Sequence, residues 1–127
     1  MKPLRGTSEL RPWLWLFGAA LAARLIYWAE AFHGPYLGYL FLDSAAWFQR
    51  ASQAAAGMES PEAYFRAPLY HWLLTAQFFI FGPNYLTPPL IQHVLGALSV
   101  VLIALTARRF YGPRAGWIAG GIAAGYA

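Results

Sequence analysis

The sequence predicts an all-α membrane protein with several transmembrane helices, that is, a polytopic one. Of its 127 residues, 59% are hydrophobic, 18% are aromatic and only 11% are charged, whereas average soluble domains carry about 25% charged residues. The apolar residues form runs of helical length that proline, glycine and charged residues separate, which is typical of a membrane protein. We expect the whole chain, residues 1–127, to belong to one membrane domain.

The charges of the chain indicate topology. The net charge is +4, and arginines such as Arg108 and Arg109 cluster at the ends of apolar runs, where they orient membrane helices. The sequence contains no basic stripe with interleaved aromatic residues, the pattern that would indicate binding of nucleic acid. We therefore expect the lipid bilayer, and no nucleic acid, as a partner. Cysteine is absent, so the sequence predicts neither a disulfide nor a cysteine metal site.

The first apolar run extends from Pro12 to Phe32 and corresponds to about 31 Å of helix, the thickness of a bilayer's hydrocarbon core. A signal peptide is the alternative, but the run is too long and no small-residue cleavage site follows it. We expect a transmembrane helix with its basic amino end in the cytosol. Arg24 lies inside this run. An intramembrane arginine is costly and typically functional, although its charged end can also reach toward the interface.

The only long polar interval extends from Leu42 to Tyr70, and residues 33–67 are predicted to form an outer loop. A helix from Asp43 to Ala56 should lie on the membrane surface, because apolar residues such as Trp47 and Ala51 recur at helical spacing. Gly57 is a suitable stop for this helix. Ser60 and the proline after it resemble a cap and first turn, so a second short helix should begin there.

Three further apolar runs follow this loop. The first of them corresponds to only about 21 Å of helix, so it must tilt or thin the bilayer in order to cross. The last holds two glycine pairs suited to close helix packing, Gly116/Gly120 and Gly121/Gly125. It ends within an apolar run, about 15 residues after Gly112, too few to cross a bilayer, so we expect the amino-terminal fragment of a longer protein. The predicted spans are 12–32, 68–82, 88–107 and 113–127.

The topology rules conflict for the arginines between the last two runs, residues 108–114. Three full crossings would place these arginines opposite the basic amino terminus. The positive-inside rule favours both clusters in the cytosol. Either the short run 68–82 does not cross the membrane, or these arginines lie outside for a purpose.

Asp43 is the strongest candidate for chemistry. An Asp just before a helix commonly caps it, and a carboxylate at a membrane face can also serve as a general base; the two roles can coexist. The three histidines, His33, His71 and His93, match no metal-binding spacing. The sequence argues for no cofactor and leaves open whether a divalent metal takes part.

A set of short motifs covers most of the chain from about Arg24 onward. The most specific are the Asp of the first outer loop, Asp43, and the Arg-x-Pro-Leu-Tyr element that begins at Arg66. The set comprises residues 42–51 (LDSAAWFQRA), 65–70 (FRAPLY), 81–82 (FG), 91–98 (IQHVLGAL) and 108–112 (RRFYG). Together they resemble the amino-terminal region of family 39-type glycosyltransferases, bacterial relatives of dolichyl-phosphate-mannose protein mannosyltransferases in the GT-C superfamily.

This resemblance implies an inverting hexosyl or pentosyl transferase of the bacterial inner membrane. It would transfer a sugar from a polyprenyl-phosphate donor to an unidentified acceptor at the outer face. By the same resemblance Asp43 is the catalytic base and Arg66 lies near the phosphate of the carrier lipid. Tyr64 and Arg24 are further candidates for substrate binding. Where many relatives have Gly-Asp after the surface helix, this chain has Gly57-Met58-Glu59, which puts a second acidic role in doubt. We expect the fragment alone to be inactive.

Two other functions stay open at this point. The chain could be a small non-enzymatic membrane protein whose loop binds a partner, with Asp43 only capping a helix. It could also be a transporter fragment with Arg24 in the translocation path, although no internal repeat supports that function. Further hydrophobic spans encoded downstream of Ala127 would favour the enzyme.

Overall fold

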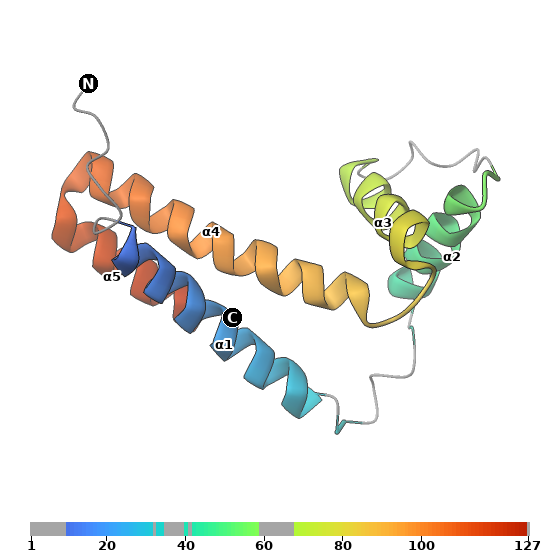
Figure 1. Cartoon of the computed structure of the whole chain (residues 1–127), viewed down its shortest axis with the longest axis horizontal. Helices are drawn as coiled ribbons and strands as arrows, with labels where there is room; N and C mark the ends of the chain where they lie inside the picture. The colour runs from blue at the N-terminus through green and yellow to red at the C-terminus, as the bar shows by residue number, and fades with distance from the viewer. Residues whose placement is uncertain (1–9, 32, 35–39, 41, 59–67, 127) are drawn as a thin grey trace. The chain divides into compact units, whose positions relative to one another are not determined.

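The computed structural model describes residues 10–31, 33–34, 40, 42–58 and 68–126, and within these ranges the regular structure is entirely α-helical. The prediction of an all-α fold is therefore confirmed (Figure 1). The short helix expected at Ser60 lies outside the described residues. The helices are α1 (Arg11–Ala31), α2 (Asp43–Ala55), α3 (Pro68–Phe81), α4 (Thr87–Tyr111) and α5 (Pro113–Gly125).

Local signals set the ends of these helices. Gly57, at φ 78°, ends α2 in a Schellman arrangement, in which the Met58 N–H donates to the Gln53 carbonyl at 2.9 Å. Asn84 caps the start of α4, because its Oδ1 accepts from the Thr87 N–H at 2.8 Å. α4 continues to Tyr111, four residues beyond the predicted end, and Gly112 at φ 91° separates it from α5.

The chain divides into two compact units, and the boundary falls within α4. The three-helix unit contains α1, α5 and α4 from Gln92 onward; the α2–α3 unit contains residues 33–91. The expectation of a single membrane domain stays a prediction.

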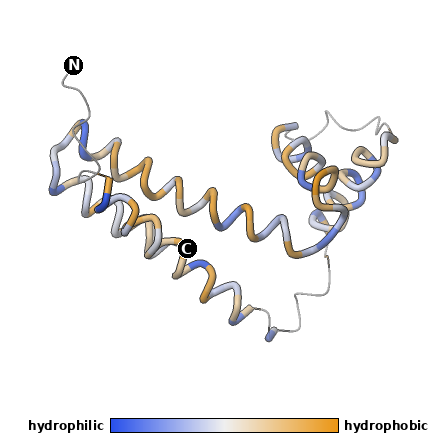
Figure 2. Tube along the Cα trace, viewed as in Figure 1, coloured by the Kyte–Doolittle hydropathy of each residue, from blue (hydrophilic) through white to orange (hydrophobic). Residues whose placement is uncertain are grey.

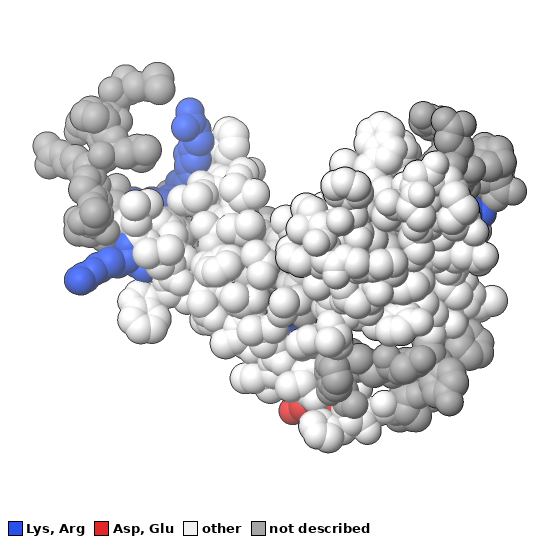
Figure 3. Space-filling view, turned by 45° about the vertical axis from the view of Figure 1, so that its right-hand side comes forward, with Lys and Arg blue, Asp and Glu red and all other residues white. Residues whose placement is uncertain are grey.

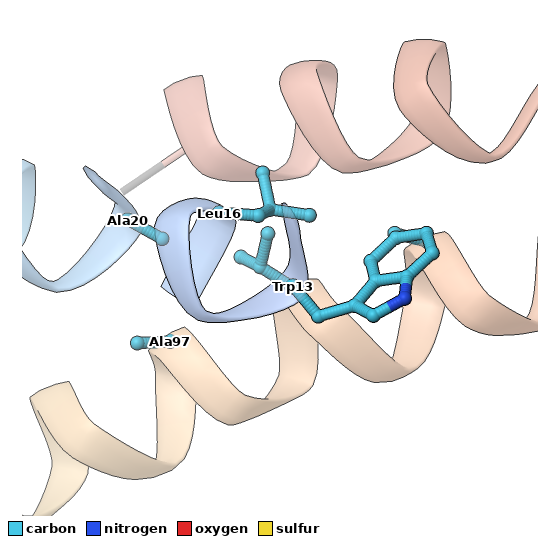
Figure 4. Packing of buried hydrophobic residues seen from close by; sticks show 6 residues of the cluster. Trp13, Leu16, Ala20 and Ala97 are labelled. Atoms are coloured by element: carbon cyan, nitrogen blue, oxygen red, sulfur yellow. The ribbon is translucent and has the colours of Figure 1, made fainter. Parts of the chain in front are cut away.

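Small residues bring the helices of the three-helix unit close together. Ala20 of α1 and Ala97 and Ala104 of α4 are completely buried, and Figure 4 shows Leu16 of α1 pointing toward α5. On α5, a Cβ at Gly120 would lie 2.9 Å from the Ala104 Cβ, so only glycine permits this approach.

The predicted glycine packing on α5 is half correct. Gly116 and Gly120 are buried against other helices, as expected. Gly121 and Gly125 have no neighbour within 4 Å of a would-be Cβ, so their predicted packing is wrong. The reason is helical geometry: each lies one residue, or about 100°, around the helix from a packed position.

The start of α1 lies beside the end of α4. The Trp13 ring stacks on Trp117 of α5 at 5.4 Å, and the Arg108 guanidinium lies 5.3 Å from the Trp13 ring centroid. α4 therefore runs antiparallel to α1 (Figure 1), and Figure 3 shows basic side chains gathered at this end of the unit. Arg11 and Arg108 thus lie at the same end of this unit, and the side of a membrane on which they lie stays a prediction.

Two helices, α1 and α4, are long and apolar enough to cross a bilayer, and Figure 2 shows apolar residues along both. Only 11% of the most apolar stretch of α1 and 17% of that of α4 are buried, whereas a core helix of a soluble protein would be mostly buried. α3 has 14 residues, or about 21 Å of helix, which is shorter than the hydrocarbon core of a bilayer.

In the α2–α3 unit, the apolar side of α2 packs on α3. Ala51 of α2 is completely buried together with Leu74 and Phe78 of α3. Phe48 meets the Phe78 ring at 4.9 Å and the Tyr85 ring at 4.7 Å. The side of α2 that we expected to rest on the membrane is thus covered by α3, because a period of 3.6 residues predicts an apolar side but not what covers it.

Candidate functional site

Asp43 is exposed in the first turn of α2. The N-cap position belongs to Leu42, which makes no side-chain capping bond, so the interpretation of Asp43 as the N-cap is wrong. A carboxylate in the first turn still complements the positive end of the helix dipole. Leu42 has φ 47° and ψ −111°, a conformation that costs a residue with a side chain free energy.

An aromatic cluster, consisting of Trp47, Tyr70 and His71, lies one turn along α2 from Asp43. Trp47 follows Asp43 by four residues, so both lie on the same side of α2. The Trp47 ring meets the Tyr70 ring edge to face at 5.3 Å and the His71 ring at 6.3 Å. The exposed carboxylate therefore lies close to a surface of flat rings, one of which, Tyr70, is 37% exposed.

His71 carries an unused polar atom next to this cluster. His71 is only 4% exposed, and its Nδ1 has no hydrogen-bond partner among the described residues. A buried imidazole nitrogen without a partner is uncommon and calls for a ligand, a water or a proton-transfer role. Sequence reasoning considered His71 only as a metal ligand and missed it here, because 24 residues separate it from Trp47.

α3 buries further polar atoms in the same unit. The Thr75 Oγ1 and Gln77 Oε1 are buried and also have no partner in the described part of the chain. Three such atoms on one 14-residue helix are unusual, because each unsatisfied group costs about 1–3 kcal/mol. α3 is therefore unlike the lipid-facing helix that its apolar composition predicts.

Arg24 belongs to the three-helix unit and faces α4. Its Nη1 donates to the Ala20 carbonyl at 3.1 Å, and its Nε would lie 2.8 Å from a Cβ at Gly96. The side chain thus runs back along α1, away from the nearer helix end. The alternative in which Arg24 extends toward the interface after Ala31 is not the observed arrangement.

The remaining predicted site residues, Arg66 and Tyr64, lie outside the described residues. Asp43 lies one turn of α2 from Trp47 of the aromatic cluster, and Arg24 belongs to the other unit. Among the described residues, no group of three or more histidines or acidic residues is arranged to hold a metal ion. No family model, curated protein or solved structure matches the chain, so the functional argument rests on these side chains and on the sequence resemblance.

Proposed function

We propose that the chain is the amino-terminal part of a membrane glycosyltransferase that uses a polyprenyl-phosphate sugar donor. The observation that carries this proposal is the exposed Asp43 at the start of α2, one turn from Trp47, whose ring meets those of Tyr70 and His71. A carboxylate beside flat rings suits a sugar acceptor, which offers a hydroxyl proton and apolar C–H faces. The motif resemblance to family 39-type glycosyltransferases supports the same function.

Asp43 acts as the base in the proposed reaction. The acceptor hydroxyl gives its proton to the Asp43 carboxylate as its oxygen bonds to the anomeric carbon of the sugar. The bond from that carbon to the phosphate oxygen breaks, and the phosphate leaves with the electron pair. Arg66 neutralises the charge that develops on the leaving phosphate, for which a bidentate guanidinium is suited. An inverted anomeric centre follows from this single displacement.

A membrane topology follows from the two long helices. Since α1 and α4 are antiparallel, crossing by both leaves residues 33–86 on one side and the two basic clusters on the other. This satisfies the positive-inside rule with the amino terminus in the cytosol. It requires that α3 does not cross, which agrees with its length of 14 residues and its buried polar atoms.

The packing of α2 gives separate support for this topology. Neighbouring residues of α2 touch both halves of α3: Trp47 meets Tyr70, and Phe48 meets Phe78. Phe48 also meets Tyr85, which follows α3. α2 also carries Asp43 and Arg50. If α3 crossed the bilayer, these charged residues would be drawn toward the hydrocarbon, at a cost of about 2.5–3.5 kcal/mol each. Both helices are therefore proposed to lie at the outer face.

The test is sugar transfer by the complete protein that contains these residues. Asp43→Asn should lower kcat by about 10²–10⁴, the usual contribution of a general base, with unchanged expression. Glu30→Gln makes the same chemical change at an exposed residue of α1 and should retain full activity. Near wild-type turnover in Asp43→Asn would refute the catalytic role.

The donor site is tested in the same assay. Arg66→Gln should raise the KM for the lipid donor and leave the KM for the acceptor unchanged, whereas Arg66→Lys should retain part of the donor affinity. An interfacial anchor would instead tolerate Arg66→Lys, and Arg66→Gln would change membrane insertion more than catalysis.

A further inference from the structure

The guanidinium of Arg24 lies near the middle of α1. Because Nη1 bonds to the Ala20 carbonyl, the charged group lies about one turn closer to the amino end than its own Cα. Ala20 is about 14 Å of helix from Arg11 and about 16 Å from Ala31. If α1 spans the bilayer, as proposed above, this permanent positive charge lies close to the centre of the hydrocarbon core, where charge is most costly.

The described chain provides no counter-charge for Arg24. Among the described residues its hydrogen-bond partner is the neutral Ala20 carbonyl, which accepts from one of its five N–H donors. The described acidic residues are Glu30 and Asp43. Glu30 lies about 9 Å further along α1 than Arg24, and Asp43 belongs to the other unit. A second copy of the chain packed in parallel would place its own Glu30 at the same distance along the helix from Arg24. It would therefore bring no acidic residue of α1 to the depth of Arg24 in the bilayer.

The surface next to Arg24 carries a second unused nitrogen. His93, three residues before Gly96, lies on the same side of α4. Its Nε2 is buried without a partner in the described part of the chain, and its ring meets Trp28 of α1 at 6.1 Å. Gly96 leaves the space that Arg24 occupies. α1 and α4 thus present a guanidinium and an imidazole along one seam.

We propose that this seam docks a transmembrane helix that carries an aspartate or glutamate in the middle of its span. The carboxylate pairs with the Arg24 guanidinium, whose planar fork binds both oxygens. Charge complementarity selects this occupant, because intramembrane arginines pair with acidic groups inside a bundle. The helix belongs to the rest of the complete protein, of which this chain is the amino-terminal part under the function proposed above.

The proposal is tested by association of the 127-residue chain with a model helix in phosphatidylcholine vesicles. The helix is a leucine-rich transmembrane peptide with one central aspartate, and its matched control has leucine at that position. Energy transfer between a dye on a Phe110→Cys chain and a dye on the peptide measures binding. We expect about tenfold tighter association with the aspartate peptide, the size of a polar contact in a bilayer.

Variants of the chain test whether Arg24 causes the preference for the aspartate peptide. Arg24→Gln should reduce the preference to less than about twofold, while it removes a costly charge and so retains the fold. Gly96→Ala, which crowds the Arg24 Nε at 2.8 Å, should weaken the preference. Arg109→Gln, at the exposed end of α4, should leave it unchanged. Equal binding of the two peptides, or a preference that survives Arg24→Gln, would overturn the proposal.

This inference rests on the proposed membrane location of α1, so flotation of the vesicles is measured first. A wild-type chain that does not float with vesicles contradicts the membrane location and the docking site together. A chain that floats but does not distinguish the peptides contradicts the docking site alone. Glycosyl transfer is tested separately, through Asp43.

Discussion

The two units of the molecule use different means to hold helices together. In the three-helix unit, alanines and glycines let backbones approach, and large side chains such as Leu14 and Ile118 point outward and are exposed. In the α2–α3 unit, aromatic rings such as Phe48 and Phe78 form the contact, and polar atoms are buried beside them. Small residues at the interface are typical of packing in lipid, whereas rings with polar tips suit a wet boundary. Under the function proposed above, the α2–α3 unit is the one that carries the chemistry.

The largest effect should come from removing a ring of the α2–α3 unit. Phe78→Ala deletes a side chain that is 2% exposed and touches Phe48, and it should cost about 3–5 kcal/mol of stability. Phe79→Ala changes the neighbouring residue, which is 78% exposed, and should cost about 0.5 kcal/mol. Detergent-induced unfolding followed by near-ultraviolet circular dichroism measures both. Equal losses in the two variants would show that rings do not hold this unit.

The next largest effect on stability should come from adding a methyl group to a packed glycine of the three-helix unit. At Gly116 a Cβ would lie 2.7 Å from the Arg108 Cβ and 2.9 Å from the Ala104 carbonyl oxygen, so Gly116→Ala should destabilise by about 1–3 kcal/mol. At Gly121 nothing lies within 4 Å, and Gly121→Ala should stabilise by about 1 kcal/mol through helix propensity. Thermal unfolding in detergent measures these opposite changes in stability. Stabilisation by both substitutions would mean that close approach at Gly116 does not hold α5 against α4.

The smallest effect should come from the residue before Asp43. Leu42 has a positive φ of 47° and is 82% exposed, so Leu42→Gly relieves backbone strain and loses little packing. We expect a gain of about 1 kcal/mol. Leu42→Ala keeps a Cβ and should give no gain, and this difference separates backbone relief from loss of an exposed leucine. A loss of stability in Leu42→Gly would show that the side chain contributes more than the strain costs.

Sequence reasoning located the helices well and their partners less well. Proline and glycine mark the ends of α3 and α5 within one or two residues, because these residues act locally. The contact between Trp47 and His71 and the closeness of Arg108 to Trp13 join residues far apart in the chain, which no spacing rule reaches. Arg24 was found because a charge in an apolar run is itself a signal, but its direction toward Ala20 depends on Gly96 of another helix.

The central claim is that α2 and α3 lie together at the outer face while the α4–α5 turn lies in the cytosol. The chain has no cysteine, so single cysteines can report on position without background. Ser44, Leu86 and Phe110 are exposed residues at the start of α2, before α4 and near the end of α4. Each is replaced by cysteine and treated in intact spheroplasts with a membrane-impermeant thiol reagent. The account predicts labelling of Ser44→Cys and Leu86→Cys, and labelling of Phe110→Cys only after lysis. Protection of Leu86→Cys together with labelling of Phe110→Cys in intact spheroplasts would mean that α3 crosses the membrane, and would contradict the account.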